Sequence, residues 1–420
     1  MKTYFVFLFL IFAVLNIYSS KPNDYELLLE WGKNYSVYIS DKIDMNYTNE
    51  NNKNYYVKEE IKKDEIVMTI PKKVLLNIDS AINILGKKIK KQFEIYKNKQ
   101  LEDKTNLNED MLYHINQSFL AYLMTIANKN KSKNNKNKLY QYYKYYFNTF
   151  ETNLEKYPLF FSTEQMRLLA FSIFGSELIS TRRLFEEEYE ILQREIHKKI
   201  LDQDEYIKYR IFTFNKFVNM TGTSYIIPFV DMLDTNPINF NLQLNYTEDS
   251  VSLVSTKDIH PGDVLSMAVV QMSNSGFFIT YGKVFEENKY FVENFRIHKI
   301  GQNFLREQKL DPLMATGEII DITEKNYYEK VIPDYIEISK ALKEDGSKAS
   351  ALRLFLENIK SIRESYNKIT VSDLFKNFFN AKTVQKIRSV LDTEKYYLDK
   401  KIREMKKIVN KYARERQHDL

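Results

Sequence analysis

Cysteine is absent from all 420 residues of this chain. Its absence excludes disulfide bonds, thiolate metal sites and a cysteine nucleophile. Glycine and proline are also scarce, with ten and eight copies, which argues against collagen-like repeats and low-complexity composition. We therefore expect an ordinary hydrophobic core to hold the fold together, and the chain is long enough to bury a large one.

The sequence also lacks the short motifs of most familiar enzyme classes. It contains no phosphate-binding P-loop, no glycine-rich dinucleotide fingerprint after a strand and no GxSxG nucleophile elbow. Its histidines lie far apart and form no HExxH zinc motif, so no metal site is expected. The five histidines are His114, His197, His260, His298 and His418.

Positive and negative charges are nearly balanced. Lysine and arginine number 62 against 56 for aspartate and glutamate, which leaves a formal net charge of +6. Such a small excess is typical of a solvated surface, and we expect no nucleic-acid partner. Hydrophobic residues make up 44% of the chain, a fraction that is usual for folded proteins.

The N-terminus carries the pattern of a secretory signal peptide. A cation at Lys2 precedes an apolar run from Tyr4 to Leu15, and small polar residues follow at Ser19 and Ser20. The run is shorter than the ~20 residues that span a bilayer comfortably, so residues 1–20 are interpreted as a cleavable signal. A retained anchor or a buried N-terminal helix is the alternative. The signal interpretation predicts a protein of the secretory pathway with no later membrane span.

Two stretches far apart in the sequence share one hairpin pattern. Residues 55–70 comprise an apolar segment, a charged turn and a second apolar segment, and residues 253–270 repeat this order around the turn Ile259–Asp263. The polar stretch 46–54 before the first hairpin is expected to be a loop. Two such hairpins favour a single β-rich body with another segment inserted between them.

The inserted segment has helical periodicity. Phe119, Leu120, Leu123 and Met124 recur at helical spacing, and the C-terminal part of the chain shows the same apolar period. The predicted fold is therefore α+β, with a β-rich core split by a helical insert and followed by an all-α domain. The predicted parts are a signal at 1–20, core segments at 21–79 and 223–300, the insert at 80–222 and the helical domain at 301–420.

Three ordered motifs carry a resemblance to a known family. They are "YYVKEEIKKDEIVMTIP" from Tyr55, "PFVDMLDTNP" from Pro228 and "GDVLSMAVVQMSNSGFFITYGKVFEEN" from Gly262. In that order and spacing the chain resembles the SET-domain protein methyltransferases, in the branch of the Rubisco large-subunit lysine methyltransferase and the actin-histidine methyltransferase. The resemblance covers nearly the whole chain after the signal and implies a pseudo-knotted core followed by a helical substrate-binding domain.

The resemblance implies S-adenosylmethionine as cofactor and a protein or peptide as substrate. The positions that would contact the cofactor are substituted in this chain. Asn52 and Asn54 stand where the family has glycines, which let the backbone approach a ligand closely. Asp234 and Thr235 stand where the family has an Asn-His pair. Asp234 adds a negative charge that could attract the cationic cofactor.

The resemblance also places the catalytic region in the third motif. Val269 occupies the position of a family tyrosine, and valine has no hydroxyl with which to orient an amine. Ser273 and Asn274 match the family, as do Tyr281 and Gly282. Tyr281 is therefore the candidate catalytic residue.

Two functions remain open at this point. The chain is either a divergent S-adenosylmethionine-dependent protein-lysine methyltransferase or an inactive relative that binds a peptide or protein. Binding of the cofactor would separate the two, because only the enzyme needs it.

Overall fold

The computed structural model describes residues 24–49, 52–102, 109–129, 136–150, 154, 156–197, 201–220, 223–268, 272–288, 295–298, 300, 302–310, 319–377 and 379–418. They fall into two compact units. The first unit is drawn from residues 1–153 and 189–269, and the second from residues 154–188 and 270–420. The predicted signal at 1–20 and Val269 lie outside the described residues.

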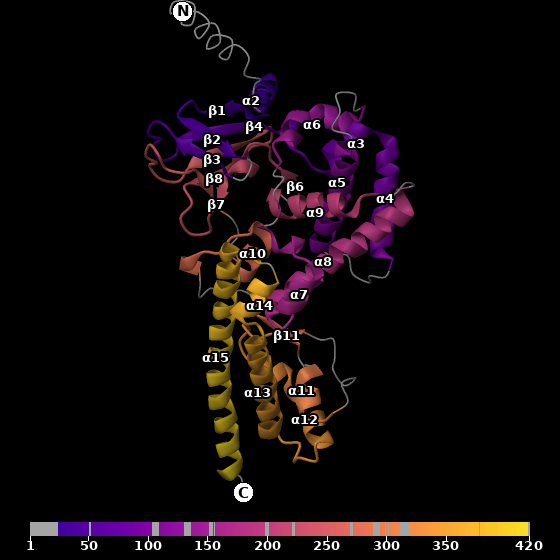
Figure 1. Ribbon diagram of the computed structural model, residues 1–420, viewed down its shortest axis with the longest axis vertical. Helices are drawn as coiled ribbons and strands as arrows, with labels where there is room; N and C mark the ends of the chain where they lie inside the picture. The colour runs from indigo at the N-terminus through magenta and orange to yellow at the C-terminus, as the bar shows by residue number, and fades with distance from the viewer. Residues whose placement is uncertain are drawn as a thin grey trace, which may run out of the picture. The chain divides into compact units, whose positions relative to one another are not determined.

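The first unit contains the strands of the β-rich core and a set of helices. Its elements are α2 (Asp24–Asn34), β1 (Tyr38–Ile39), β2 (Ile43–Asn49), β3 (Asn52–Val57), β4 (Ile66–Pro71), α3 (Ile78–Leu85), α4 (Lys87–Leu101), α5 (Glu109–Asn128), α6 (Lys138–Asn148), α9 (Gln203–Lys216), β5 (Phe217–Met220), β6 (Thr223–Ile226), β7 (Asp234–Thr235), β8 (Leu242–Tyr246), β9 (Ser250–Ser255) and β10 (Ser266–Met267). Within this unit the strands gather on one side and helices α3–α6 and α9 on the other (Figure 1).

The second unit is mainly helical. Its elements are α7 (Thr163–Leu169), the first part of α8 (Ile173–Ile191), α10 (Asn274–Tyr281), β11 (Arg296–His298), α11 (Gln302–Glu307), β12 (Ile319–Asp321), α12 (Ile332–Ala341), α13 (Lys348–Ser365), α14 (Val371–Lys376) and α15 (Ala381–His418). Helices α13 and α15 run side by side, with α12 against α13 (Figure 1). The short β11–β12 pair is the sheet of this unit in the part of the chain that the structure describes. The predicted α+β class with a helical C-terminal region is confirmed.

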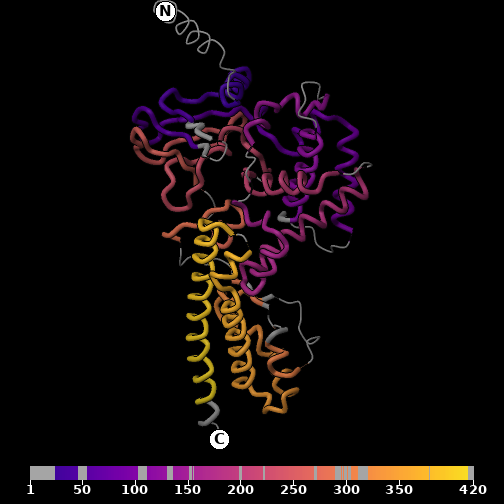
Figure 2. Tube along the Cα trace, viewed as in Figure 1, coloured from indigo at the N-terminus to yellow at the C-terminus, as the bar shows by residue number. Residues whose placement is uncertain are grey.

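A six-stranded sheet joins strands from the two segments that were predicted as hairpins. Neither segment is a hairpin: β3 pairs with β2 rather than β4, and β9 pairs with β4 and β8 rather than β10. The strand order is β1-β4-β9-β8-β10-β7, so β4 from the first segment pairs with β9 from the second, antiparallel, with Met68 opposite Leu253. The early and late segments therefore interleave within the first unit (Figure 2). Val67, Met68 and Ile70 of β4 are fully buried, as expected for strand residues that face a core.

The turns of these two segments are joined by reciprocal hydrogen bonds. Ile61 and Ile259 exchange both backbone bonds, at 3.0 and 2.9 Å. In the first turn Asp64 donates to Ser255 O, and in the second Gly262 donates to Val57 O. Both donors have positive φ, 66° and 93°, which glycine and aspartate adopt more readily than most residues. The repeated sequence pattern therefore corresponds to a repeated backbone geometry.

Helix faces and caps explain the helical parts. The predicted apolar set Phe119, Leu120, Leu123 and Met124 lies on α5 and is fully buried. Asn77 caps α3 by accepting from Ser80 N, and Ser162 caps α7 by accepting from Gln165 N, which satisfies otherwise unpaired amides. No helix among the described residues is long and apolar enough to cross a membrane.

Candidate functional site

The candidate site begins with the turn at Phe229, which follows β6. Phe229 has a φ of +72°, a conformation that costs a residue with a side chain on the order of 1–3 kcal/mol. Its ring is fully buried and stacks on Trp31 at 6.2 Å between centroids. Gly32 leaves room for it, since a Cβ there would lie 2.7 Å from Phe229 Cζ. Packing against α2 therefore holds the strained backbone of Phe229, two residues before Asp231.

Asp231 is anchored by two elements of the first unit. Tyr146 on α6 donates its hydroxyl to Asp231 Oδ2 at 2.8 Å, and Lys216 at the end of α9 donates to Asp231 O. Tyr146 is fully buried. Burial, and then the neighbouring charge of Asp231, raises the pKa of Tyr146 well above its ordinary value. This hydroxyl is therefore a permanent donor that fixes the turn, and no motif in the sequence marked it.

The following residues, Asp234 and Thr235, form the edge strand of the six-stranded sheet. They pair in parallel with β10, with Asp234 opposite Ser266 and Thr235 opposite Met267. Asn241 fixes β10 from the other side, accepting from Ser266 N at 2.8 Å and donating to Val264 O at 2.9 Å. The fold thus places the second motif beside the third. The paired strand β10 ends at Met267, two residues before Val269. Asp234 and Thr235 are both half-buried.

The structure corrects the prediction for the polar stretch 46–54. It is a hairpin rather than a loop, because β2 and β3 pair with Asn46 opposite Asn54 and Asn49 opposite Asn52. Asn52 and Asn54 therefore have extended backbones that any residue adopts, and neither has a positive φ. Substituting asparagine for glycine here introduces no backbone strain. The substitution instead adds a side chain to the strand, and the side chain of Asn54 is half-buried.

In the second unit, the residues that match the family motif hold their local structure. Ser273 caps α10 by accepting from Gly276 N at 3.2 Å. Asn274 is fully buried and exchanges two bonds with Phe285, accepting from its N at 3.1 Å and donating to its O at 3.0 Å. Asn288 adds a bond to Met272 O at 2.8 Å. The Ser-Asn pair is thus explained by the fold of this segment, independently of any ligand.

Tyr281 is the last residue of α10. It is half-buried and packs beside Phe277, with ring centroids 6.0 Å apart. Gly282 ends the helix in the left-handed conformation at φ 64°, as is common for a C-terminal cap. A Cβ at Gly282 would lie 2.5 Å from the backbone oxygen of Lys156. Glycine is therefore required here both for conformation and for space.

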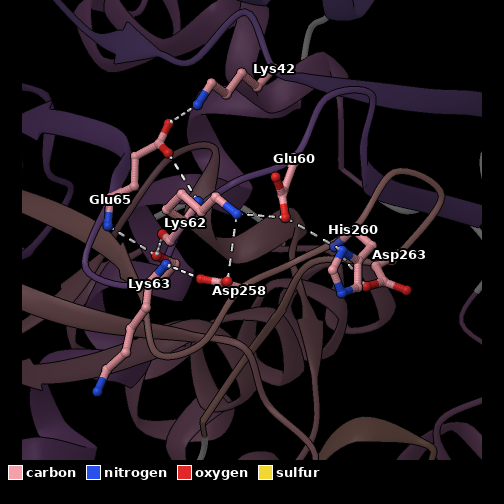
Figure 3. Close-up of polar contacts among 9 residues, drawn as sticks. Lys42, Glu60, Lys62, Lys63, Glu65, Asp258, His260 and Asp263 are labelled. Carbon is pink, nitrogen blue, oxygen red and sulfur yellow. Dashed lines mark hydrogen bonds and ion pairs between the residues drawn. The ribbon is translucent and has the colours of Figure 1, made fainter.

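A polar network covers the two joined turns (Figure 3). Lys42 pairs with Glu65 of the first turn at 2.6 Å. Lys63 N, in the first turn, donates to Asp258 Oδ1 beside the second turn at 2.8 Å. The side chains are largely exposed, and such pairs contribute at most about 1 kcal/mol each. The network links the turns and does not form a reaction centre. It comprises Lys42, Glu60, Lys62, Lys63, Glu65, Asp258, His260 and Asp263.

Comparison with solved structures identifies the fold. No family model and no curated protein sequence matches the chain. Solved structures do match. The SET domain of LSMT bound to lysine and AdoHcy aligns with a TM-score of 0.64 over 95% of this chain and 96% of that one, at 12% identity.

The chain has a SET-domain fold. Rubisco LSMT bound to sinefungin and monomethyllysine aligns with a TM-score of 0.62 over 92% of each chain, at 12% identity. Rubisco LSMT bound to AdoMet gives 0.63 over 93% of this chain and 94% of that one, at 11% identity. The predicted resemblance is thereby confirmed at the level of the fold, over almost the whole length of both proteins.

The predicted site residues lie on three elements of the structure. Asp234 and Thr235 lie on the sheet edge beside β10, Asn52 and Asn54 lie on the β2–β3 hairpin, and Tyr281 ends α10 in the other unit. Sequence reasoning did not find the anchor from Tyr146 to Asp231, since a tyrosine in an aromatic helix carries no motif. Within the described residues, no group of acidic or histidine side chains could hold a metal ion.

Proposed function

We propose that the chain is an S-adenosylmethionine-dependent protein methyltransferase that acts on a lysine side chain. The observation that supports it most strongly is the match over 92–95% of the chain to LSMT structures that are bound to lysine and AdoHcy, to sinefungin and monomethyllysine, or to AdoMet. The retained Tyr281 and the anchored segment around Asp231 are consistent with this role.

The residues of the first unit fit such a cofactor in chemical type. β7 lies at one edge of the six-stranded sheet in the described residues and pairs with β10 of the third motif. The half-buried carboxylate of Asp234 suits a cationic sulfonium or ammonium group. Asn54 and Thr235 offer an amide and a hydroxyl as further hydrogen-bonding groups.

When bound, the cofactor would supply an electrophilic methyl group on a positively charged sulfur. The protein must then present a neutral amine in line with that methyl group and keep water away. Tyr281 would accept a hydrogen bond from the amine through its phenolic oxygen and so orient the lone pair. Transfer would break the bond between sulfur and the methyl carbon and leave a positively charged methylated amine, whose extra proton would pass to solvent.

A titration with S-adenosylmethionine tests this proposal. Free ligand at about a hundred times its Kd should stabilise the protein by about 2.7 kcal/mol, which thermal or urea unfolding can measure. Asp234→Ala should weaken the effect, whereas Asp263→Ala, on the exposed turn network of the same unit, should leave it unchanged. Unaltered unfolding of the native chain at millimolar cofactor would refute the proposal.

The second candidate is a SET-fold module that binds a protein or peptide without catalysis. Val269, without a hydroxyl at a family tyrosine position, favours it, as do the asparagines at 52 and 54. Val269→Tyr discriminates between the two. Methyl transfer that appears only in this variant supports the inactive module, and transfer by the native chain to a lysine peptide rules it out.

We further propose that the protein enters the secretory pathway, on the basis of the apolar segment from Tyr4 to Leu15. N-terminal sequencing of the protein recovered from its native cell tests this. A mature chain beginning after Ser19 or Ser20 is expected, and an intact Met1 would contradict cleavage.

A further inference from the structure

A groove opens on the surface of the second unit between α14 and the first half of α15. Its volume is about 610 Å³, within the usual range of binding pockets in proteins. Val384 in its lining is buried, whereas Val371, Phe375 and Tyr396 line it with 41–50% of their surface exposed. These three are among nine large hydrophobic side chains that are exposed in the described part of the chain. Such a gathering of exposed apolar surface is typical of a site that binds a partner.

The half of α15 beyond the groove is strongly basic. Residues 400–414 contain seven lysines and arginines and a single acid, Glu404, which pairs with Lys401 at 3.0 Å. The six other cations have exposed side chains, and we call them the basic strip: Lys400, Arg403, Lys406, Lys407, Lys411 and Arg414. Apart from Lys411, none of them forms a side-chain ion pair with another described residue. The strip therefore presents positive charge that the described fold does not use.

The basic strip continues the groove along one side of α15. Side chains that are 7 or 18 residues apart share a face of an α-helix, because these intervals make about two and five turns. Arg403 and Arg414 follow Tyr396 at these two intervals, and Tyr396 lines the groove. The opposite face of the helix is turned to the core of the unit, where Met405 is fully buried. One surface thus carries an apolar groove and then a row of cations about 21 Å long, at ~1.5 Å per residue.

We propose that this surface binds an extended acidic segment of another protein. An apolar side chain of the segment occupies the groove, and its aspartates or glutamates lie along the basic strip. Charge complementarity selects this occupant, since Glu404, the acid within 400–414, already pairs with Lys401. An extended chain advances ~3.3 Å per residue, so about six or seven residues cover the strip. The inference goes beyond the proposed function and does not depend on methyl transfer.

Other occupants fit this surface less well. A second copy of the same face would bring like charges together. A membrane would need an apolar helix face beside the cations, and on α15 that face is buried within the unit. Single-stranded nucleic acid needs aromatic platforms among the cations. The aromatic residue within 400–414 is Tyr412, which is half-buried and has the amine of Lys348 over its ring at 4.4 Å.

Fluorescence anisotropy with three labelled peptides tests the proposal on the full chain. The first peptide has a leucine-phenylalanine anchor followed by a run of glutamates long enough to cover the basic strip. In the second peptide glutamine replaces every glutamate, and in the third serine replaces both anchor residues. We expect the first peptide to bind about tenfold or more tightly than either of the others, because it alone supplies both the apolar burial and the charge pairs. Added salt should weaken its binding.

Substitutions of exposed residues locate the binding. Arg403→Gln/Lys407→Gln should weaken binding of the first peptide about threefold to thirtyfold, through the loss of two exposed charge pairs. Phe375→Ala should weaken binding of the first peptide and leave that of the third, which has no anchor, unchanged. Lys87→Gln/Lys91→Gln is the matched control, because it removes two exposed charges at the same spacing from α4, a second basic helix in the first unit. It should have no effect.

Several outcomes would overturn the inference. Equal binding of the first and second peptides would exclude charge recognition, and an unchanged affinity in Phe375→Ala would exclude the groove. An equal loss in the α4 control would show unspecific charge attraction. Tighter binding of an RNA oligonucleotide or of anionic lipid vesicles, or a dimer that Arg403→Gln/Lys407→Gln dissociates, would identify another occupant. Because no readout involves S-adenosylmethionine or methyl transfer, this inference and the proposed function fail separately.

Discussion

The two groups of candidate site residues differ in how the fold uses them. In the second unit, Ser273, Asn274 and Gly282 match the family motif, and they serve as a helix cap, a buried amide bridge and a left-handed turn. In the first unit, the family positions are substituted, and the residues there lie on regular strands that accept many side chains: Asn52, Asn54, Asp234 and Thr235. The match to the family motif persists where the local fold requires a particular residue, and it is lost on the regular strands.

This contrast explains why motif retention alone is a poor guide to activity. Asn274 is buried and bonds to both backbone groups of Phe285, so it is constrained by the cost of leaving polar atoms unpaired. A half-buried residue on an edge strand has no such constraint. Substitutions at four positions test the difference between the units, beginning with the largest expected effect.

The second unit should be sensitive to pH. Glu394 on α15 is buried and accepts from the hydroxyl of Tyr366 at 2.7 Å. Burial raises its pKa from 4.5 to about 8, despite that hydrogen bond, and the charge of Glu177 adds to the rise. The folded state therefore holds the proton longer than the unfolded state, so stability is full below about pH 4.5 and falls as pH rises toward 8.

Glu394→Gln should remove this dependence, because the amide imitates the protonated acid. At about 1.4 kcal/mol per pKa unit, the native chain would lose at most about 5 kcal/mol between pH 4.5 and 8. Urea unfolding at several pH values measures it, with Glu357→Gln on α13 as the control. Parallel pH profiles for the native chain and Glu394→Gln would contradict the assignment.

Asn274→Ala should destabilise the second unit by about 2–4 kcal/mol, because it leaves the N–H and C=O of Phe285 without their partner. Ser275→Ala, the next residue along α10, is the matched control and should change the unfolding free energy by less than about 1 kcal/mol. Chemical denaturation measures both. An unchanged unfolding free energy in Asn274→Ala would show that the local fold does not require this asparagine.

Gly32→Ala should disturb the first unit, since the new Cβ would lie 2.7 Å from Phe229 Cζ. We expect a loss of about 1–3 kcal/mol from overpacking, together with weaker binding of S-adenosylmethionine. Gly276→Ala in the second unit is the counterpart. Its Cβ meets only the flexible Met272 at 3.3 Å, so it should be neutral or stabilising by up to about 1 kcal/mol.

Asn54→Gly should have the smallest effect on stability, a cost of about 0.5–1 kcal/mol for glycine in a strand. If asparagine blocks close approach of the backbone to a ligand, the variant should bind S-adenosylmethionine more tightly. Isothermal titration measures the affinity. Weaker binding in Asn54→Gly would show that the amide itself serves as a ligand group and that the substitution is functional.

The sequence predicted the periodic features well. Apolar spacing identified the buried face of α5, where Phe119, Leu120, Leu123 and Met124 are fully buried. Alternation and turn residues located strands and turns in the segments 55–70 and 253–270, but the predicted hairpin pairing was wrong, because each strand pairs with a partner from elsewhere in the chain. The stretch 46–54 was wrongly predicted as a loop, because its asparagines have low strand propensity and its strand structure comes from the pairing of β2 with β3.

What the sequence determined by itself is local: the helix faces, the caps, the turns and the absence of thiol chemistry. The tertiary structure decided which of those pieces meet. Three contacts join residues far apart in the chain: the parallel pairing of Asp234 with Ser266, the bond from Tyr146 to Asp231 and the bond from Lys386 to Gly282 O. Such contacts depend on how the whole core packs, and no local propensity encodes them.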